Sequence, residues 1–358
     1  MQVYLIGGFL GSGKTTAVQK ACTTLLRTGV PVGVVTNDQG QQLVDSGFMA
    51  GFNIPVEEVT NGCFCCNYAD LEQRIQYLQA AHRPDIIFAE SVGSCTDLVA
   101  TVLHPLQQFH PDLKVAITVF ADACVLPSLM KGSRILHQQV TYIYKKQLDE
   151  ADVLVINKCD LLNGVQLEEV MQLVTTHYPG KVVLYQNSLQ QEDIQRWLTI
   201  LNNYQPPAKR KTLDIDYNEY GAGEAKLAWF DTSLEIHTTD HSAVATGLEL
   251  INRIGFTINR HQWPIGHVKF LLDDGRQQRK ISFTLMNRPV LHPEPGSDSR
   301  EARLLINARV QTDPLELKKV ISYAIRDVVT QTGCTITEGE TAAFQPGYPT
   351  PEHRMVGG

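Results

Sequence analysis

Short apolar runs alternate with helical stretches through roughly the first two hundred residues. Runs rich in β-branched and other apolar side chains have the length of buried strands. They span residues 3–6, 32–36, 85–89, 115–119, 153–156 and 182–185. Strands that alternate with helices are typical of βαβ units. We therefore predict an α/β fold for residues 1–204, with a mostly parallel sheet covered by helices.

A smaller domain is predicted after a polar connection. Residues 205–226 contain two prolines and two glycines and lack apolar periodicity, which indicates a linker. Residues 227–333 combine strand-like runs with two helical stretches, so we expect a C-terminal α+β domain. Residues 334–358 are rich in proline and glycine and are expected to form an extended or frayed tail.

The segment after the first predicted strand has the pattern of a phosphate-binding loop. Residues 8–16, GFLGSGKTT, match G-x-x-x-x-G-K-[ST] and lead into a helical stretch. Backbone N–H groups of such a loop face phosphate oxygens, Lys14 reaches the β and γ phosphates, and Thr15 ligates Mg²⁺. The fold is therefore predicted to be a P-loop NTPase. The nucleotide-binding residues expected here are Gly8, Gly11, Ser12, Gly13, Lys14, Thr15 and Thr16.

A second motif indicates which base is bound. Asn157-Lys158-Cys159-Asp160 follows the apolar strand 153–156, at the edge where parallel sheets bind ligands. Asp160 can accept two hydrogen bonds from the N1–H and N2 amino groups of guanine, and adenine lacks this pair of donors. We therefore expect Asn157, Lys158 and Asp160 to select GTP. A helix-capping segment before the next helix is the alternative.

Two further acidic positions are candidates for sensing the γ-phosphate. The strand 85–89 leads to Glu90 and then Gly93, where a carboxylate holds Mg²⁺ and a glycine N–H meets the γ-phosphate. The alternative is that Glu90 starts a helix. Asp38, after the second strand, could touch Mg²⁺, the attacking water or a second metal, or lie in an ordinary polar turn. With Lys14, these carboxylates form the predicted catalytic set of a GTPase.

A cluster of cysteines indicates metal chemistry. Cys63, Cys65 and Cys66 are three of the eight cysteines and precede a predicted helix. Closely spaced thiolates can grip one soft or borderline cation, and the helix N-terminus should lower their pKa values. The fourth ligand is expected to be Asp38, a histidine, water or a partner's residue. Buried thiols without a ligand, or a redox pair, are the alternatives.

Composition excludes some partners. The net charge of −7 gives no general attraction to nucleic acid or anionic membranes. The first residues lack the features of a signal peptide, and no apolar run approaches the ~20 residues of a membrane span. We expect a cytoplasmic protein without nucleic-acid or membrane partners.

Together these motifs resemble the CobW-like family of metal-related GTPases, which is related to UreG and HypB. The resemblance covers roughly residues 1–200, and the G-C-x-C-C pattern of residues 62–66 is its most specific part. It implies metal ligation by Cys63, Cys65 and Cys66, a further ligand at Asp38, Mg²⁺ at Thr15, and guanine selection by Asn157 and Asp160. It also implies a client metalloenzyme or corrinoid protein, and a homodimer. Residues 37–40 and 90–93 depart from the usual family patterns, so switch chemistry can differ.

The resulting hypothesis is a GTP-binding metallochaperone with a nucleotide-gated cysteine site. GTP and Mg²⁺ would order residues 37–66 for binding of Zn²⁺, Co²⁺ or Ni²⁺, and hydrolysis to GDP would release the ion. Turnover should be slow, at about 10⁻⁴–10⁻² s⁻¹. The main alternative is a GTP-driven conformational activator of a corrinoid or other metalloenzyme, with a structural metal site. A small-molecule kinase is a third possibility, but it would need neither the thiolates nor the N-K-x-D motif.

Overall fold

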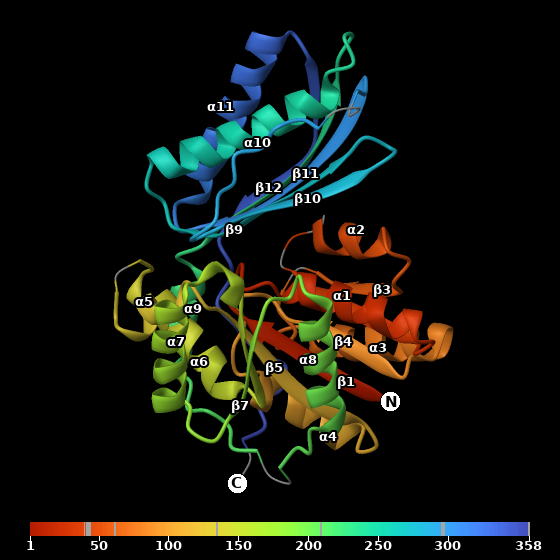
Figure 1. The fold of residues 1–358 in the computed structure, drawn as a ribbon, viewed down its shortest axis with the longest axis vertical. Coiled ribbons are helices and arrows are strands. Elements are labelled where there is room, and N and C mark those ends of the chain that lie inside the picture. The colour runs from red at the N-terminus through yellow and green to blue at the C-terminus, as the bar shows by residue number, and fades with distance from the viewer. Residues whose placement is uncertain are drawn as a thin grey trace. The chain divides into compact units, whose positions relative to one another are not determined.

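The structure is a computed structural model that describes residues 1–38, 40, 44–60, 62–133, 135–207, 210–294 and 298–356. The chain forms two compact units (Figure 1). The first unit comprises residues 1–39, 52–223 and 348–358, and the second comprises residues 40–51 and 224–347. Neither unit is one continuous stretch of chain. Residues 40–51 belong to the second unit, although residues of the first unit precede and follow them, and residues 348–358 follow the second unit but belong to the first.

The first unit is built on a seven-stranded parallel sheet with strand order β3-β2-β4-β1-β5-β6-β7. Its strands are β1 (Gln2–Gly8), β2 (Val32–Asn37), β3 (Val56–Val59), β4 (Ile86–Glu90), β5 (Lys114–Asp122), β6 (Val153–Asn157) and β7 (Val182–Gln186). The predicted α/β fold with a parallel sheet is confirmed. All seven strands end at the same edge, so the residues that follow them gather there.

Helices connect these strands. They are α1 (Lys14–Arg27), α3 (Tyr68–His82), α4 (His104–Phe109), α5 (Leu126–Met130), α6 (Gln138–Glu150), α7 (Gly164–His177), α8 (Gln191–Asn203) and α9 (Tyr217–Glu224), with helical turns η1 (Val99–Leu103) and η2 (Cys159–Leu161). The connections carrying α1 and α3 cross the sheet in opposite directions, so right-handed crossovers place these helices on opposite faces. Trp197 of α8 packs on Phe88 and Phe120. Within the described ranges, no helix is long and apolar enough to cross a bilayer.

The predicted linker is packed against the first unit. Its helix α9 buries Tyr220 against Ile143 and Ile215. Although the segment is polar overall, a few buried apolar side chains hold it in place.

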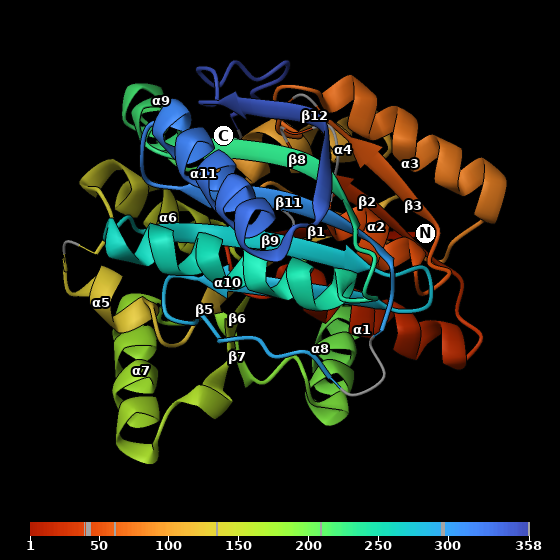
Figure 2. The same cartoon turned by 90° about the horizontal axis from the view of Figure 1, so that it is seen from above.

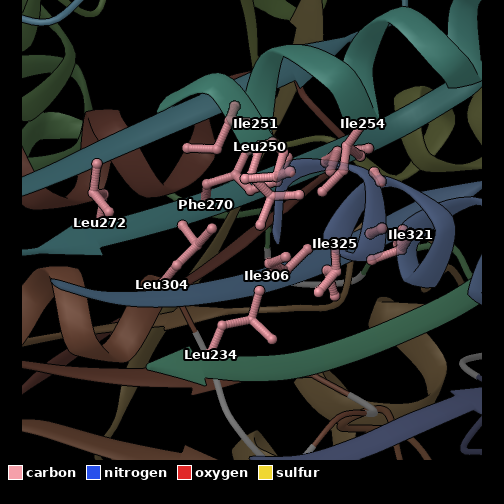
Figure 3. Close-up of a cluster of buried hydrophobic side chains, with 14 of the residues drawn as sticks. Leu234, Leu250, Ile251, Ile254, Phe270, Leu272, Leu304, Ile306, Ile321 and Ile325 are labelled. Carbon is pink, nitrogen blue, oxygen red and sulfur yellow. The ribbon is translucent and has the colours of Figure 1, made fainter. Parts of the chain in front are cut away.

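The second unit is an antiparallel five-stranded sheet with order β10-β9-β11-β8-β12. Its elements are β8 (Ala228–His237), α10 (Ala243–Arg260), β9 (Ile265–Asp273), β10 (Gln278–Thr284), β11 (Glu301–Val310), α11 (Pro314–Thr332) and β12 (Thr335–Phe344). Figure 2 shows α10 and α11 over one face of this sheet. Their apolar sides form a core with the sheet, in which Ile254 and Ile325 face Phe270 and Ile306 (Figure 3).

Two segments depart from the predicted partition. Helix α2 (Val44–Ala50) follows β2 in sequence but packs on β9, β10 and β11 of the second unit. Asp45 pairs with Lys269 and Lys280, and Asn307 accepts a hydrogen bond of 2.8 Å from the backbone of Val44. The expected tail instead begins with strand β12, and residues 348–356 return to the first unit. Long-range contacts decide both placements.

Asp45→Asn tests how firmly α2 is held. Burial alone would raise the pKa of Asp45, but Lys269 and Lys280 outweigh it and lower the pKa. The carboxylate therefore stabilises the fold above its unfolded pKa, and this stability is lost as the pH falls. At pH 7 the substitution should lower the free energy of unfolding by roughly 1.5–3 kcal/mol, measured by urea denaturation. Glu235→Gln, which changes an exposed carboxylate on β8, is the control. Equal midpoints for both variants would contradict the assignment.

Candidate functional site

The turn between β1 and α1 requires glycine at two positions. Gly8 has φ +126°, and a Cβ there would lie 2.2 Å from the carbonyl oxygen of Phe120. Gly13 has φ +95°, and a Cβ there would lie 2.3 Å from Nδ2 of Asn157. Both positions are unfavourable for a side chain on conformational and steric grounds. The loop can therefore run close to neighbouring strands and turn its backbone toward a bound phosphate.

Lys14 and Thr15 open helix α1 inside this loop. The ammonium of Lys14 donates 2.7 Å to the carbonyl of Gly8, and Thr15 Oγ1 donates 2.8 Å to Oε1 of Glu90. The structure thus brings together the two residues predicted to bind Mg²⁺, and their oxygen donors fit a hard cation. The buried Ser12 hydroxyl has no hydrogen-bond partner among the described residues. A phosphate oxygen would supply one.

The loop after β4 touches the phosphate-binding loop. A Cβ on Gly93 would lie 2.6 Å from the side chain of Leu10 and 2.9 Å from its backbone nitrogen. Gln147 of α6 donates 3.0 Å to the carbonyl of Gly93. Gly93 therefore lies against the phosphate-binding loop, and its position beside the γ-phosphate stays a prediction.

Asn157 connects two loops at the carboxyl edge of the sheet. Its Nδ2 donates 2.8 Å to the carbonyl of Ser12. Its Oδ1 accepts hydrogen bonds from the backbone and hydroxyl of Ser188, at 3.0 and 2.8 Å. The side chain predicted to help select guanine thus braces the phosphate-binding loop against the turn after β7. Ser188 was not predicted, although its place just beyond a parallel strand could have drawn attention to it.

Lys158 and Asp160 complete the motif after β6. Lys158 adopts φ 64°, donates 2.6 Å to the carbonyl of Gly11, and pairs with Asp122 at 2.6 Å. Asp160 lies in η2 and is exposed to solvent. Asp122 ends β5 and was another residue that the sequence analysis missed. The lysine therefore holds the loop, while the exposed carboxylate of Asp160 can meet a base from solvent.

Cys63, Cys65 and Cys66 form a compact thiol group. Their sulfurs are separated by 2.7, 3.3 and 3.7 Å, and all lie within 4.8 Å of one another. A tetrahedral zinc site with bonds of ~2.3 Å places its sulfurs about 3.8 Å apart. Three soft donors already gathered within this range fit such an ion. Asp38 is outside this close group, so its role as a ligand stays a prediction, and Gln39 and Asn61 lie outside the described residues.

The pKa values of these thiols differ from expectation. The helix N-terminus was expected to lower them, yet hydrogen bonds with Cys63, Cys66 and Cys95, followed by burial, raise the pKa of Cys65 well above its ordinary value. A hydrogen bond with Cys63 is the main cause that raises the pKa of Cys66 to about 11. The hydrogen bonds among the thiols therefore raise these pKa values more than the helix N-terminus lowers them. Metal binding must therefore release protons.

Asn37 ties the end of β2 to the cysteine loop. Its Nδ2 donates to the carbonyls of Val59 and Gly62, at 3.0 and 2.7 Å, and its Oδ1 accepts from the backbone of Phe64 at 2.8 Å. These bonds lie immediately before Asp38, the residue predicted to sense the nucleotide. A displacement of this strand end would therefore move the cysteine loop.

Residues 348–356, here called the C-terminal strap, lie along the thiol group. The backbone N–H of Glu352 donates 3.0 Å to the carbonyl of Cys65, and that of Thr350 hydrogen-bonds to Cys66. The Glu352 carboxylate accepts 2.9 Å from the backbone of Ala69, at the start of α3. The least buried of the three thiols is thus bordered by the strap.

Side chains of the strap anchor it to the first unit. Arg354 forms an ion pair of 2.8 Å with the buried Asp97 and lies over the ring of Tyr217. The ring of His353 packs edge-on against Tyr68 and Phe109. This segment, expected to be a frayed tail, is therefore an ordered part of the site.

The glycine loop, the Thr15–Glu90 pair and the N-K-x-D turn at one edge of a parallel sheet define a P-loop nucleotide-binding protein. The model of the CobW/HypB/UreG nucleotide-binding domain matches residues 2–186, and the chain belongs to this family.

Several characterised proteins resemble this chain. The zinc chaperone CobW of Sinorhizobium sp is 26% identical over 200 residues, covering 49% of this chain and 56% of that protein. The zinc chaperone YjiA of Escherichia coli is 31% identical over 159 residues, covering 42% and 49%. Thus the chain spans about half the length of the curated relatives it matches. Among solved structures, the nickel complex of HypB from Helicobacter pylori has a TM-score of 0.43 and 18% identity, covering 58% of this chain and 91% of that one.

Removal of the Arg354 anchor should expose Cys66. We expect Arg354→Ala to raise the rate of alkylation of Cys66 by iodoacetamide about tenfold, because the strap opens more often. Peptide mapping by mass spectrometry gives the rate for each cysteine. Arg326→Ala, at an exposed position on α11, is the control. If Cys66 reacts at the same rate in both variants, the strap does not protect the site.

Proposed function

We propose that this protein is a GTP-hydrolysing metallochaperone that binds a transition metal ion at Cys63, Cys65 and Cys66 and delivers it to a client metalloenzyme. The observation that carries the proposal is the set of hydrogen bonds from Asn37 to the cysteine loop. They connect a strand end at the nucleotide edge of the sheet to the backbone of Gly62 and Phe64, the residues on either side of Cys63. A nucleotide-binding protein with this connection is suited to control metal binding.

The nucleotide half of the function rests on the loop and its neighbours. Lys14 contacts the phosphates, Asp160 accepts hydrogen bonds from guanine, and Thr15 and Glu90 hold Mg²⁺. When bound, Mg²⁺ neutralises charge that develops on the phosphate oxygens. Asp38 orients the attacking water.

The coupling proceeds through backbone connections within the first unit. Asp38 and Gly93 approach the γ-phosphate, and Asn37 transmits the position of β2 to the carbonyl of Gly62 and the N–H of Phe64. In the triphosphate state the thiols converge on the ion. Hydrolysis loosens the strand end and releases the ion to the client.

Zinc is the ion that we favour, because several relatives are zinc chaperones by name. Cobalt and nickel also tolerate thiolate ligands, so metal supply to the protein decides among them. We further propose that the protein acts as a homodimer.

A second candidate is a GTP-driven conformational activator with a structural metal site. Helix α2 supports it, because the residues that follow β2 are anchored in the second unit through Asp45. A nucleotide-dependent movement after Asp38 would then reach the second unit without transfer of an ion. Client binding that depends on GTP but leaves the metal content of both proteins unchanged would favour this activity.

Metal affinity should depend on the bound nucleotide through Asn37. We expect the reduced protein to bind Co²⁺ at least about tenfold more tightly with Mg²⁺ and a non-hydrolysable GTP analogue than with Mg²⁺–GDP. In Asn37→Ala the two affinities should become nearly equal, because the connection to the cysteine loop is lost. Titration followed by the cobalt–thiolate absorption band measures both.

The matched control is Asn203→Ala, at an exposed position at the end of α8. It should retain the full difference between the nucleotides. Equal affinities in the wild type would refute nucleotide gating, and a retained difference in Asn37→Ala would refute this route for it.

Asp160→Ala should abolish base selection. Loss of two hydrogen bonds to a charged acceptor should weaken GTP binding about 100-fold, while ITP, which lacks the N2 amino group, should lose less. Fluorescence competition assays give both affinities. Asp112→Ala, at an exposed position away from the nucleotide edge, should change neither. A preserved preference for GTP over ITP in Asp160→Ala would contradict the assignment.

A further inference from the structure

A fourth cysteine approaches the thiol group from a different part of the chain. Cys95 lies in the loop after β4, its side chain is 0% exposed, and its thiol is in hydrogen-bonding contact with those of Cys63 and Cys65. Two bonds hold its backbone: Cys95 N–H donates 3.0 Å to the carbonyl of Val92, and its own carbonyl accepts 2.8 Å from Gln147. These two bonds place Cys95 beside the cluster, on a loop that α6 contacts.

The direction of approach matters for coordination. Cys63, Cys65 and Cys66 belong to one short turn, closed by a 3.0 Å hydrogen bond from the backbone N–H of Cys66 to the carbonyl of Cys63. Three ligands from one turn leave one corner of a tetrahedron open. Cys95 contacts two of these thiols, while the close group of three does not include it. Because Cys95 comes from a different loop, its thiol can approach the open corner from outside the turn.

We propose that Cys95 is the fourth metal ligand, so that the ion is held by Cys63, Cys65, Cys66 and Cys95. The inference rests on the proposed function and specifies its site. Four thiolates suit a divalent ion of the zinc class. On binding, the ion exchanges water for sulfur, and the thiol protons pass to solvent without any change of oxidation state.

The position of Cys95 also links the ligand set to the nucleotide. Gly93, two residues earlier, touches the phosphate-binding loop, and Glu90 binds Thr15. The loop that faces the γ-phosphate thus carries one ligand, while Asn37 controls the loop that carries the others. We infer that Cys95 coordinates in the GTP state and withdraws in the GDP state, which lowers the affinity for the ion.

The other side of Cys95 is restrained as well. Asp97 adopts φ 66°, accepts 2.7 Å from the hydroxyl of Tyr217, and pairs with Arg354 of the strap. Thr96 donates 3.3 Å to the buried Glu150. The loop is therefore bonded at Gly93 and at Asp97, on either side of Cys95. We expect a movement of Gly93 to displace Cys95 as well.

The test is to count the sulfurs around the ion. Full-length reduced protein is loaded with one equivalent of Zn²⁺ in the presence of Mg²⁺ and a non-hydrolysable GTP analogue or GDP, and X-ray absorption at the zinc edge is recorded. We expect four sulfurs at ~2.3 Å with the GTP analogue and three with GDP. This measurement uses the wild-type chain and does not depend on the folding of any variant.

Substitution then identifies the fourth ligand. In Cys95→Ser with the GTP analogue, the cobalt–thiolate absorption should fall by about one quarter, and Zn²⁺ affinity should fall at least about tenfold. Cys22→Ser, which changes an equally buried thiol on α1, is the control and should bind like the wild type. Binding of a fluorescent GDP analogue verifies that both variants are folded.

The outcomes separate this inference from the function on which it rests. Three sulfurs with the GTP analogue, or unchanged cobalt spectra and Zn²⁺ affinity in Cys95→Ser, would overturn the role of Cys95 and leave a three-cysteine chaperone site intact. Four sulfurs in both nucleotide states would confirm the ligand but overturn its withdrawal. Absence of tight binding in the wild type would overturn both the inference and the metallochaperone function.

Discussion

The parallel arrangement of the seven strands is the constraint on which the site depends. Because every strand ends at the same edge, residues that are far apart in sequence meet there: Gly8, Asn37, Glu90, Asp122 and Asn157 all end strands. Backbone hydrogen bonding sets the register of the strands, so these side chains are positioned before any ligand arrives. The phosphate-binding loop, the N-K-x-D turn and the cysteine loop are all attached to this one edge.

Short polar contacts connect the strand ends at this edge to the cysteine loop and to the C-terminal strap. Asn37 holds the cysteine loop by its main chain, and the loop from Glu90 to Asp97 contacts the phosphate-binding loop at one end and the C-terminal strap at the other. Hydrogen bonds of this kind are directional, so a displacement at one end changes the geometry at the other. These contacts are the physical basis of the proposed coupling between the nucleotide and the thiols.

Motifs that are local in sequence can be recognised from residue spacing alone. The glycine loop and the three-cysteine turn each bring their functional groups together within a few residues, so spacing alone indicates the chemistry. Thr15 and Glu90 are in contact, because the strand-end rule places both at one edge, while their binding of Mg²⁺ stays a prediction. Cys95 was missed, since its thiol meets the others only after β4 has been inserted into the sheet.

The predictions that rested on composition or on position along the chain were wrong for two segments, because neither property reveals long-range contacts. The segment after residue 334 is rich in proline and glycine, yet it contributes strand β12 and a strap anchored by Arg354. Helix α2 lies between two strands of the first unit in sequence but belongs to the second, because Asp45 finds two lysines there. The thiol pKa values rise because the sulfurs share protons, an effect that a helix N-terminus cannot reveal.

The sequence by itself determined the fold class, the phosphate-binding loop, the N-K-x-D turn and the presence of a thiol cluster, because hydrophobic periodicity and residue spacing are local properties. Only the tertiary structure decided which unit each segment joins, which residues brace Asn157 and Asn37, and that Cys95 and the C-terminal strap border the thiol group. Those facts depend on side chains separated by tens to hundreds of residues, and only the packing of the sheet and its loops brings them into contact.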